Sequence, residues 1–419
     1  MSDKKIYFYK GNENIIAKNE KEGEGKEPTE KIRESFSKVL DGKNLSFLLG
    51  CGCSSFYSDA KDVGIPTMIH LSKEFYDTIL DKEDNKWLKD TLKLDTSKDN
   101  FSKNLETLLS SLYNIHFFYQ STNQQDEANS IKVASIIKTT RNFLLKKCLN
   151  ENNSTSENDK QLIELYKIFY RKLLYRSSNL NKPNIFTTNY DLYSEIALDT
   201  LGIHYVNGFS GGIKKYFNPT IFNYALAEKM DLSQTKWSVI DNFIYLYKIH
   251  GSLNWIQDEK GEKLFKVREL QETSFDKLKE EEVIMIYPTP LKYNATLGSP
   301  YSDLFREFQK KLMQNNNVLI TIGYSFSDEH INNLIYQAFT IPTFRLIVLG
   351  DLKENKEIEK LQFLNDPRIW IIGGELENGK NLHFFDEFVN KILPDLSNDD
   401  LDKKMDFTIS ELIGKIKNE

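Results

Sequence analysis

The sequence predicts an α/β protein with a parallel sheet that is covered by helices on both faces. Short apolar segments rich in β-branched and aromatic residues end in glycine or polar residues, and helical patterns such as 328–339 lie between some of them. These segments are "SFLLG", "NIFTTNYD", "IYLYKIHGS", "VIMIYPTP", "NVLITIGYS", "FRLIVLGD" and "RIWIIGG". Near-continuous apolar strands that alternate with helices are typical of a buried parallel sheet, so we expect a Rossmann-like fold.

A second pattern predicts a helical subdomain inserted into this fold. Apolar residues recur at i, i+3, i+4 and i+7 in several stretches, as a helix with one buried face requires. They are Leu105, Leu108, Leu109 and Leu112, then Val133, Ile136, Ile137 and Leu144, then Leu162, Leu165, Tyr166, Phe169 and Leu173. We therefore expect a helical insertion over 71–178, between the two parts of the Rossmann-like domain at 36–70 and 179–393.

Both ends of the chain are expected to lie outside that domain. Asn12 to Glu30 are polar, charged and glycine-containing, which predicts a flexible N-terminal extension over 1–35. Residues 394–419 are expected to form a helical tail with an apolar face of Phe407, Leu412, Ile413 and Ile416. Within the domain, "NWIQDEKGEKLFKV" predicts a hairpin that turns at Glu259–Glu262.

Composition excludes several classes of protein. The 419 residues carry a net charge of −6, so bulk charge does not favour nucleic-acid binding. No apolar run is long enough to span a membrane, and the N-terminus lacks a signal-peptide core, so a cytoplasmic location is expected. Three cysteines without a secretory signal argue against a disulfide framework.

Because ligands of open parallel sheets bind beyond the carboxyl ends of the strands, the residues that follow each strand are candidates for the site. The first strand is followed by Gly50-Cys51-Gly52-Cys53-Ser54-Ser55. Its glycines suit either a phosphate cradle or a plain tight turn, and Ser55 stands where a dinucleotide fingerprint would have a third glycine. No second cysteine pair accompanies Cys51 and Cys53, so zinc is not expected, and Cys148 on an apolar helix face is expected in the core.

The later strand ends also carry polar groups. Thr187, Thr188, Asn189 and Asp191 follow the second strand, where Asp191 could cap the next helix. His250 ends an apolar strand before a glycine, and it is either structural or a group that transfers protons near neutral pH. A further segment runs from Gly323 through Ser325 to Asp328, where Ser327 or Asp328 could cap a helix. Asp351 suits either a ribose or adenine contact or a turn.

Taken together, these strand ends resemble the sirtuin superfamily. "GCGCS" resembles the Gly-Ala-Gly-x-Ser loop of that family, and "GIP" at 64–66 resembles the Gly-Ile-Pro that follows it. "TTNYD" resembles the Thr-Gln-Asn-x-Asp motif, in a form common in bacterial sirtuin-like proteins. "HGS" resembles the catalytic His-Gly, and "GYSFSD" resembles the Gly-x-Ser-x-x-Asp segment of the bacterial branch. The order and spacing agree over about 47–351.

The resemblance implies an NAD site and a role for each matching residue. Asn189 would hold the nicotinamide ribose and the attacking water, and His250 would act on the ribose hydroxyls. Gly50, Gly52 and Ser54 would bind pyrophosphate, and Ser325 would contact the adenosine side. The full set of expected NAD-binding residues is Gly50, Cys51, Gly52, Ser54, Thr188, Asp191, Gly323, Ser325 and Asp351, with Asn189 and His250 catalytic and no metal ligand.

Two departures from the family pattern narrow the expected activity. Three scattered cysteines cannot build the four-cysteine zinc ribbon of deacylating sirtuins, and Thr67-Met68-Ile69 replaces the Asp-Phe-Arg that follows Gly-Ile-Pro in them. The resemblance therefore implies a bacterial antiviral-defence enzyme that hydrolyses NAD to nicotinamide and ADP-ribose. Such an enzyme is expected as a homo-oligomer or beside a HerA-type ATPase. An NAD-dependent protein deacylase and a non-catalytic NAD- or ADP-ribose-binding subunit remain the alternatives.

Overall fold

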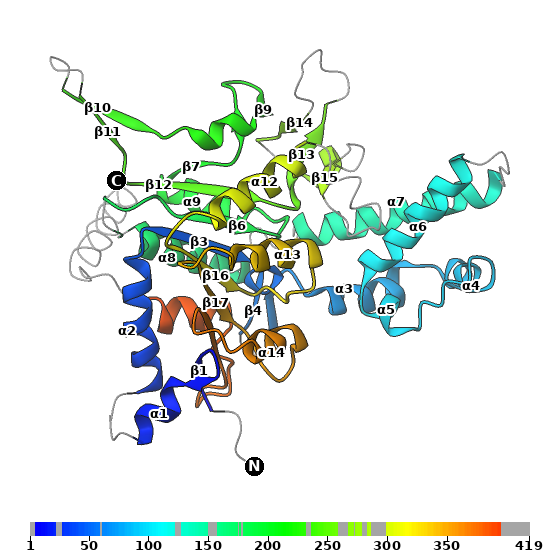
Figure 1. Ribbon diagram of the computed structural model, residues 1–419. Helices are drawn as coiled ribbons and strands as arrows, with labels where there is room; N and C mark the ends of the chain where they lie inside the picture. Colours follow the sequence, from blue (N-terminus) through cyan, green and yellow to red (C-terminus); the bar gives the residue numbers. More distant parts are fainter. Residues whose placement is uncertain are drawn as a thin grey trace, which may run out of the picture.

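The computed structural model describes residues 5–21, 27–58, 61–121, 127–149, 157–174, 176, 179–231, 236–258, 267–271, 273–278, 283–285 and 299–394. Its centre is a nine-stranded sheet in the order β2-β1-β18-β17-β16-β3-β6-β12-β7 (Figure 1). The strands are β1 Tyr7–Lys10, β2 Glu13–Asn14, β3 Asn44–Leu49, β6 Asn184–Thr187, β7 His204–Val206, β12 Phe243–Lys248, β16 Asn317–Ile322, β17 Arg345–Leu349 and β18 Ile369–Gly373. From β18 to β7 every neighbouring pair is parallel, which confirms the expected Rossmann-like α/β fold.

The order of the parallel strands determines where the sheet can bind a ligand. Without the edge strand β7, the six strands β12-β6-β3-β16-β17-β18, numbered in chain order from β3, follow the 3-2-1-4-5-6 order of dinucleotide-binding sheets. The chain runs outward in one direction from β3 and in the other from β16, so the strand order reverses between these two strands. Ligands of such sheets bind outside the carboxyl ends at this reversal.

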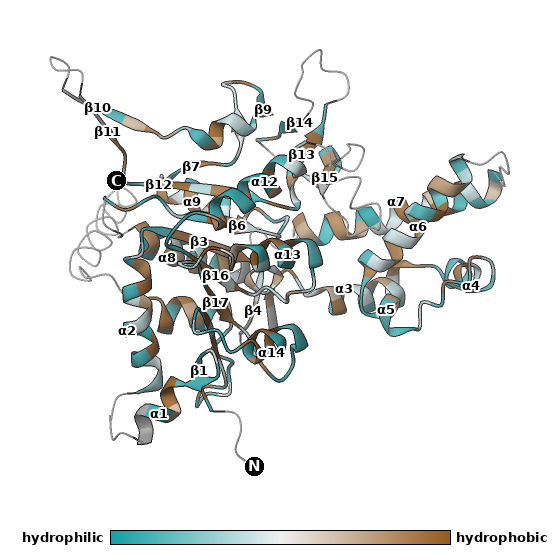
Figure 2. Ribbon diagram, in the orientation of Figure 1, coloured by the Kyte–Doolittle hydropathy of each residue, from teal (hydrophilic) through white to brown (hydrophobic). Residues whose placement is uncertain are grey.

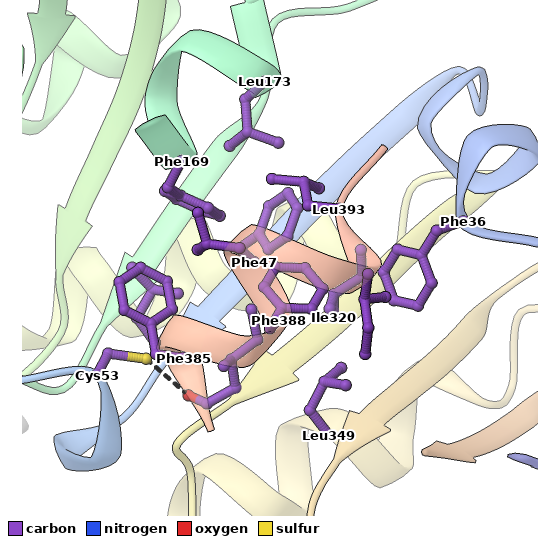
Figure 3. Close-up of a cluster of buried hydrophobic side chains, with 14 of the residues drawn as sticks. Phe36, Phe47, Cys53, Phe169, Leu173, Ile320, Leu349, Phe385, Phe388 and Leu393 are labelled. Carbon is purple, nitrogen blue, oxygen red and sulfur yellow. Dashed lines mark hydrogen bonds between the residues drawn. The ribbon is translucent and has the colours of Figure 1, made fainter. Parts of the chain in front are cut away.

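Both faces of the sheet are covered by helices, as the fully buried strands require. In β3, Phe47 and Leu49 belong to the apolar cluster on one face, and Leu48 belongs to the cluster on the other. The first face is covered by α2 Pro28–Leu40, α8 Glu157–Leu174, α9 Tyr193–Leu201, α15 Phe385–Glu387 and η4 Phe388–Ile392, and Figure 3 shows part of this cluster. The second face is covered by α12 Tyr301–Leu312, α13 Glu329–Ala338 and α14 Lys356–Phe363.

The N-terminal segment differs from the expected flexible extension in its described residues. Strand β1 pairs antiparallel with β18, with Tyr7 opposite Gly373, and Phe8 is fully buried. Helix α1 Ile15–Lys21 follows, and α2 begins at Pro28 and buries Ile32 and Phe36. The segment is polar on average, but its few apolar residues complete the edge of the sheet and one of its faces.

The helical insertion forms an arm beside the sheet (Figures 1 and 2). A hairpin of β4 Ser55–Ser58 and β5 Lys61–Gly64 leads into the arm. The arm itself consists of α3 Met68–Glu74, η2 Phe75–Ile79, α4 Lys82–Asp90, α5 Asp99–Ser102, α6 Leu105–Ser121 and α7 Glu127–Leu149. The helices of the arm share their own apolar core. Helix α8 lies inside the range expected for the insertion, 71–178, but it packs on the central sheet and against α9.

A smaller antiparallel sheet is formed by strands from both sides of β12 in the sequence. Its order is β15-β13-β14-β9-β8, with β8 Phe209–Ser210, β9 Lys215–Phe217, β13 Gly251–Gln257, β14 Val267–Glu269 and β15 Val283–Met285. Strands β13 and β14 pair as expected for the predicted hairpin, whose turn lies outside the described residues. The remaining elements are β10 Ala227–Asp231 paired with β11 Lys236–Val239, η3 Pro219–Asn223 and α10 Phe275–Leu278. Of the predicted helical tail at 394–419, residues 395–419 also lie outside the described residues.

Candidate functional site

A cavity of about 390 Å³ lies at the carboxyl ends of the parallel strands, where the strand order reverses. The strand ends contribute Cys51, Ser54, Thr188, Asn189, Tyr190, Asp191, His250, Gly323, Tyr324, Ser325, Ser327 and Asp328 to its wall. The hairpin-to-α3 segment and the insertion contribute Ile65, Pro66, Thr67, Met68, Leu71, Lys103, Asn104, Glu106, Leu144 and Cys148. Both expected catalytic residues, Asn189 and His250, line this one cavity because the strands that precede them, β6 and β12, are neighbours in the sheet.

The turn after β3 and the loop after β16 interlock at the floor of the site. The N–H of Gly50 donates to the carbonyl of Ile322 (2.9 Å), and the N–H of Gly52 donates to the carbonyl of Gly323 (3.0 Å). A Cβ on Gly52 would lie 2.8 Å from the Cα of Gly323, and one on Gly50 would lie 2.6 Å from the Cα of Tyr324. Both glycines are therefore required by the close approach of two main chains.

The hydrogen bonds of the glycine turn allow its two interpretations, a phosphate cradle and a plain tight turn, to be compared. The N–H groups of Gly50, Gly52, Cys53 and Ser54 all donate to main-chain carbonyls, and 51–53 form the 3₁₀ turn η1. Gly50 and Gly52 are not part of the cavity wall, whereas Cys51 and Ser54 are. The tight-turn interpretation accounts for these contacts without a ligand. The pyrophosphate contact stays a prediction, and the N–H groups of Gly50, Gly52 and Ser54 could make it only by exchanging partners.

Asn189 is held rigidly at the end of β6. Its side-chain nitrogen donates to the carbonyl of Gly50 (2.9 Å), and its main-chain N–H donates to Oγ1 of Thr187 (3.0 Å). The hydroxyl of Thr187 donates in turn to the carbonyl of Leu49 (3.1 Å). One N–H of the Asn189 side chain is thus engaged, and its second N–H and its oxygen are the hydrogen-bonding groups that remain on this cavity-lining residue.

Asp191 lies beside Asn189 and is fixed from two sides. Ser54 Oγ donates to Oδ2 of Asp191 (2.5 Å), and the N–H of Tyr193 donates to Oδ1 (3.2 Å). The N-cap position of α9 is Leu192, which makes no side-chain cap hydrogen bond, so Asp191 contacts the start of the helix from one residue before the cap position that the sequence allowed for it. Because a serine has one hydroxyl proton, the Ser54 side chain is a donor to Asp191 in this structure and not to a ligand.

Lys248 supports the same loop from inside the protein. Its ammonium lies 2.9 Å from Oε1 of Glu195, and the two side chains are 1% and 9% exposed. It also donates to the carbonyls of Tyr190 (3.3 Å) and Asp191. Burial raises the pKa of Glu195, and the adjacent Lys248 opposes that shift. The buried pair thus fixes the main chain that follows Asn189.

Removal of the Lys248 ammonium should destabilise the protein. Lys248→Met leaves Glu195 as a buried carboxylate without its cation, which costs about 3 kcal/mol in the free energy of unfolding. Denaturant unfolding followed by circular dichroism measures this loss. Lys360→Met removes a solvent-exposed pair with Glu357 and should leave the stability nearly unchanged. Equal stability of the two variants would contradict the role given to Lys248.

His250 follows β12 and meets a carboxylate from another loop. Its Nε2 lies 3.1 Å from Oδ2 of Asp328, and the side chains are 13% and 9% exposed. Asp328 caps α13, as the sequence allowed, because its Oδ1 accepts from the N–H groups of His330 (3.0 Å) and Ile331 (3.3 Å). The contact with His250 could not be found from the sequence, since the two residues are far apart in the chain and no local pattern joins them.

The three thiols are not suited to act as nucleophiles. Burial raises the pKa of Cys51 and of Cys53, and it raises the pKa of Cys148 to about 12. Cys53 donates from Sγ to the carbonyl of Ile322 (3.3 Å), the contact drawn as a dashed line in Figure 3. Cys148 lines the cavity and also contacts apolar clusters, so it is only partly the core residue expected from its helical position.

Replacement of the cavity-facing thiol should therefore have little effect. Cys51→Ala keeps the backbone of the turn and removes a protonated thiol, so activity should stay within about threefold of the wild type. Steady-state kinetics on the purified variant measures this. If Cys51→Ala abolished turnover while ligand binding persisted, the sulfur would have a chemical role.

Of the remaining candidate residues, three line the cavity and one does not. Thr188, Gly323 and Ser325 line the cavity, and the Ser325 hydroxyl donates to Oγ of Ser327 (3.0 Å). Asp351 is not part of the wall. Its Oδ1 accepts from the N–H of Lys353 (2.7 Å). This contact fits a turn, which was one of the two interpretations of Asp351 from the sequence.

The sequence did not identify the insertion as part of the site. Lys103, Asn104 and Glu106 bring polar groups to the wall from the start of α6, and Met68, Leu71 and Leu144 bring apolar ones. None of them belongs to a recognisable motif, and the fold of the arm alone brings them to the strand ends. Their nearest sequence signal was "GIP" at 64–66, whose Ile65 and Pro66 also line the cavity.

Among the described residues, no group of histidine, cysteine, aspartate or glutamate side chains is arranged to hold a metal ion. The same part of the chain contains no helix that is long and apolar enough to span a bilayer.

Comparison with known proteins relates part of the chain to a family. No curated protein matches the chain. Residues 183–349 match a family model described as a SIR2-like domain. The matched range runs from just before β6 to the end of β17 and contains Asn189, His250 and Asp328. This similarity to SIR2-like domains supports a relationship between the chain and sirtuin-like proteins.

Proposed function

We propose that this protein hydrolyses NAD to nicotinamide and ADP-ribose. The similarity of residues 183–349 to SIR2-like domains suggests an NAD-related activity. The observation that carries the finer proposal is the placement of Asn189 and His250 on one cavity, at the reversal point of a sheet with dinucleotide-binding strand order.

The reaction breaks the bond between the ribose C1′ and the nicotinamide nitrogen. The electron pair of that bond goes to the nicotinamide ring, the oxygen of a water molecule bonds to C1′, and one proton is released. Such a cleavage has an oxocarbenium-like transition state, which fixed polar groups stabilise without a strong nucleophile. Asn189 would hold the ribose and the water through its side chain. His250 would accept a proton from a ribose hydroxyl, the hydroxyl would regain a proton from the attacking water, and His250 would then release the one net proton.

The proposal includes a biological setting. The resemblance of the motifs implies depletion of NAD in bacterial antiviral defence, and a resemblance in domain layout implies activity as a homo-oligomer or regulation by a HerA-type ATPase. The absence of a four-cysteine zinc ribbon from the sequence favours hydrolysis over deacylation.

The test is to incubate the purified full chain with NAD, with and without a HerA-type ATPase and DNA, and to separate the products by chromatography. Nicotinamide and ADP-ribose in either arm support the proposal. A third arm adds an acyl-lysine peptide, and nicotinamide release only in that arm would establish the deacylase alternative. Binding of NAD without nicotinamide release in any arm would establish the non-catalytic alternative.

A further inference from the structure

We infer that Asp328 is the positioning residue of His250, whose carboxylate sets the orientation and the proton position of the imidazole. The effect that we expect on NAD cleavage rests on the proposed function, whereas the effect on the proton position of the imidazole does not.

The two carboxylate oxygens of Asp328 make different contacts. Oδ1 accepts from two N–H groups at the start of α13, at 3.0 and 3.3 Å, and Oδ2 lies 3.1 Å from Nε2 of His250. A carboxylate held at one oxygen by a helix terminus cannot rotate freely, so the second oxygen stays directed at the imidazole. The cap thus fixes the contact with His250.

The loop before Asp328 is itself held in place. Phe326 has φ of +56°, a conformation that is unfavourable for a residue with a side chain, and its ring is 1% exposed. Asn332 from α13 donates to the carbonyl of Phe326 (2.7 Å) and accepts from the hydroxyl of Tyr324 (2.9 Å). These contacts tie the loop to the helix that Asp328 caps.

The contact has a definite chemical consequence for the imidazole. Oδ2 lies within ion-pair distance of Nε2 of His250, outside hydrogen-bond geometry, so the negative carboxylate favours a proton on Nε2 through its charge. Nδ1 is then the acceptor of the neutral ring. When the ring accepts a second proton, the carboxylate stabilises the resulting cation.

Other titratable groups share the cavity with this pair. They are Cys51 from the turn after β3, Tyr190 and Asp191 from the loop after β6, Tyr324 from the loop after β16, and Lys103, Glu106 and Cys148 from the insertion. Within the described part of the chain, Asp328 is the carboxylate that lies within ion-pair distance of His250.

The test compares substitutions that all keep a helix cap. Asp328→Asn keeps an oxygen for the two N–H groups but removes the charge, and Asp328→Ser also caps a helix but is too short to reach His250. The matched control is Asp81→Asn, because Asp81 caps α4 in the arm by accepting from the N–H of Glu83 (3.0 Å).

We expect both Asp328 variants to lower kcat for NAD about tenfold or more, with KM changed less than about threefold. In Asp328→Asn the acidic limb of the pH profile of kcat/KM should move down by about one pH unit. The limb moves down because loss of the anion makes the imidazole easier to deprotonate. Asp81→Asn should match the wild type. Unchanged kcat and an unchanged acidic limb in Asp328→Asn would overturn the inference.

A second readout does not depend on activity. Nitrogen NMR of histidine-labelled protein, with His250→Gln to assign the signal, reports which ring nitrogen carries the proton. The wild type should carry it on Nε2 and Asp328→Asn should shift it toward Nδ1, because the new amide NH₂ would face Nε2. The same tautomer in both proteins would contradict the inference. If the tautomer shifts as expected but the wild-type protein does not cleave NAD, the proposed function is rejected and the inference about Asp328 stands.

Discussion

Asn189→Ala should lower kcat for NAD cleavage by about 10²- to 10³-fold, the loss that follows removal of one fixed polar group from a transition-state site. The variant should still fold. It loses one hydrogen bond, from the Asn189 side chain to the carbonyl of Gly50, which is worth about 1 kcal/mol. Steady-state kinetics and denaturant unfolding on the same preparation measure both quantities.

The matched control for this variant is Asn333→Ala. Asn333 is exposed on α13 and is not part of the cavity wall, so its truncation should leave kcat and stability unchanged. If Asn189→Ala retained wild-type kcat, Asn189 could not be catalytic. If the variant failed to fold, the small structural cost assigned to the lost hydrogen bond would be wrong.

The second large effect is expected at the interlocked turns. Gly50→Val places a branched side chain against the main chain of Gly323 and Tyr324, where even a Cβ would approach the Tyr324 Cα to 2.6 Å. The two loops would have to separate at the centre of the sheet, so we expect a loss of more than about 4 kcal/mol in the free energy of unfolding. NAD binding should be lost with it.

Gly212→Val is the control for this substitution. A Cβ on Gly212 meets nothing within 4 Å, so stability should change little. Denaturant unfolding and NAD titration by calorimetry compare the two variants. A Gly50→Val protein with wild-type stability would show that the two turns can separate without cost.

The sequence predicts most of the central sheet because the strands are local apolar segments. Residues such as Leu45, Phe47 and Leu49 belong to a short, mostly apolar strand whose residues are all buried, and this apolar run is visible without the rest of the chain. The strand ends that carry Asn189 and His250 could be identified for the same reason. Parallel pairing then brings them to one edge.

The features that the sequence did not predict depend on contacts between distant segments. Strand β1 has four residues, and its place is set by pairing with β18 near the other end of the chain. Helix α8 has the same periodicity as the insertion helices, but its apolar face meets the sheet. The contact of Asp328 with His250 likewise requires β12 and the loop after β16 to be placed first.

The central claim is best tested by the products that the purified wild-type chain forms from NAD. Chromatography should show nicotinamide and ADP-ribose accumulating in a one-to-one ratio as NAD disappears, in the presence of the partner if the isolated chain is inactive. Both products should accumulate about 10²- to 10³-fold more slowly with Asn189→Ala, and product formation should likewise be strongly reduced with His250→Ala, at matched concentration. NAD that stays intact with the wild type in every arm, or product formation that is equal in the wild type and both variants, would contradict the account.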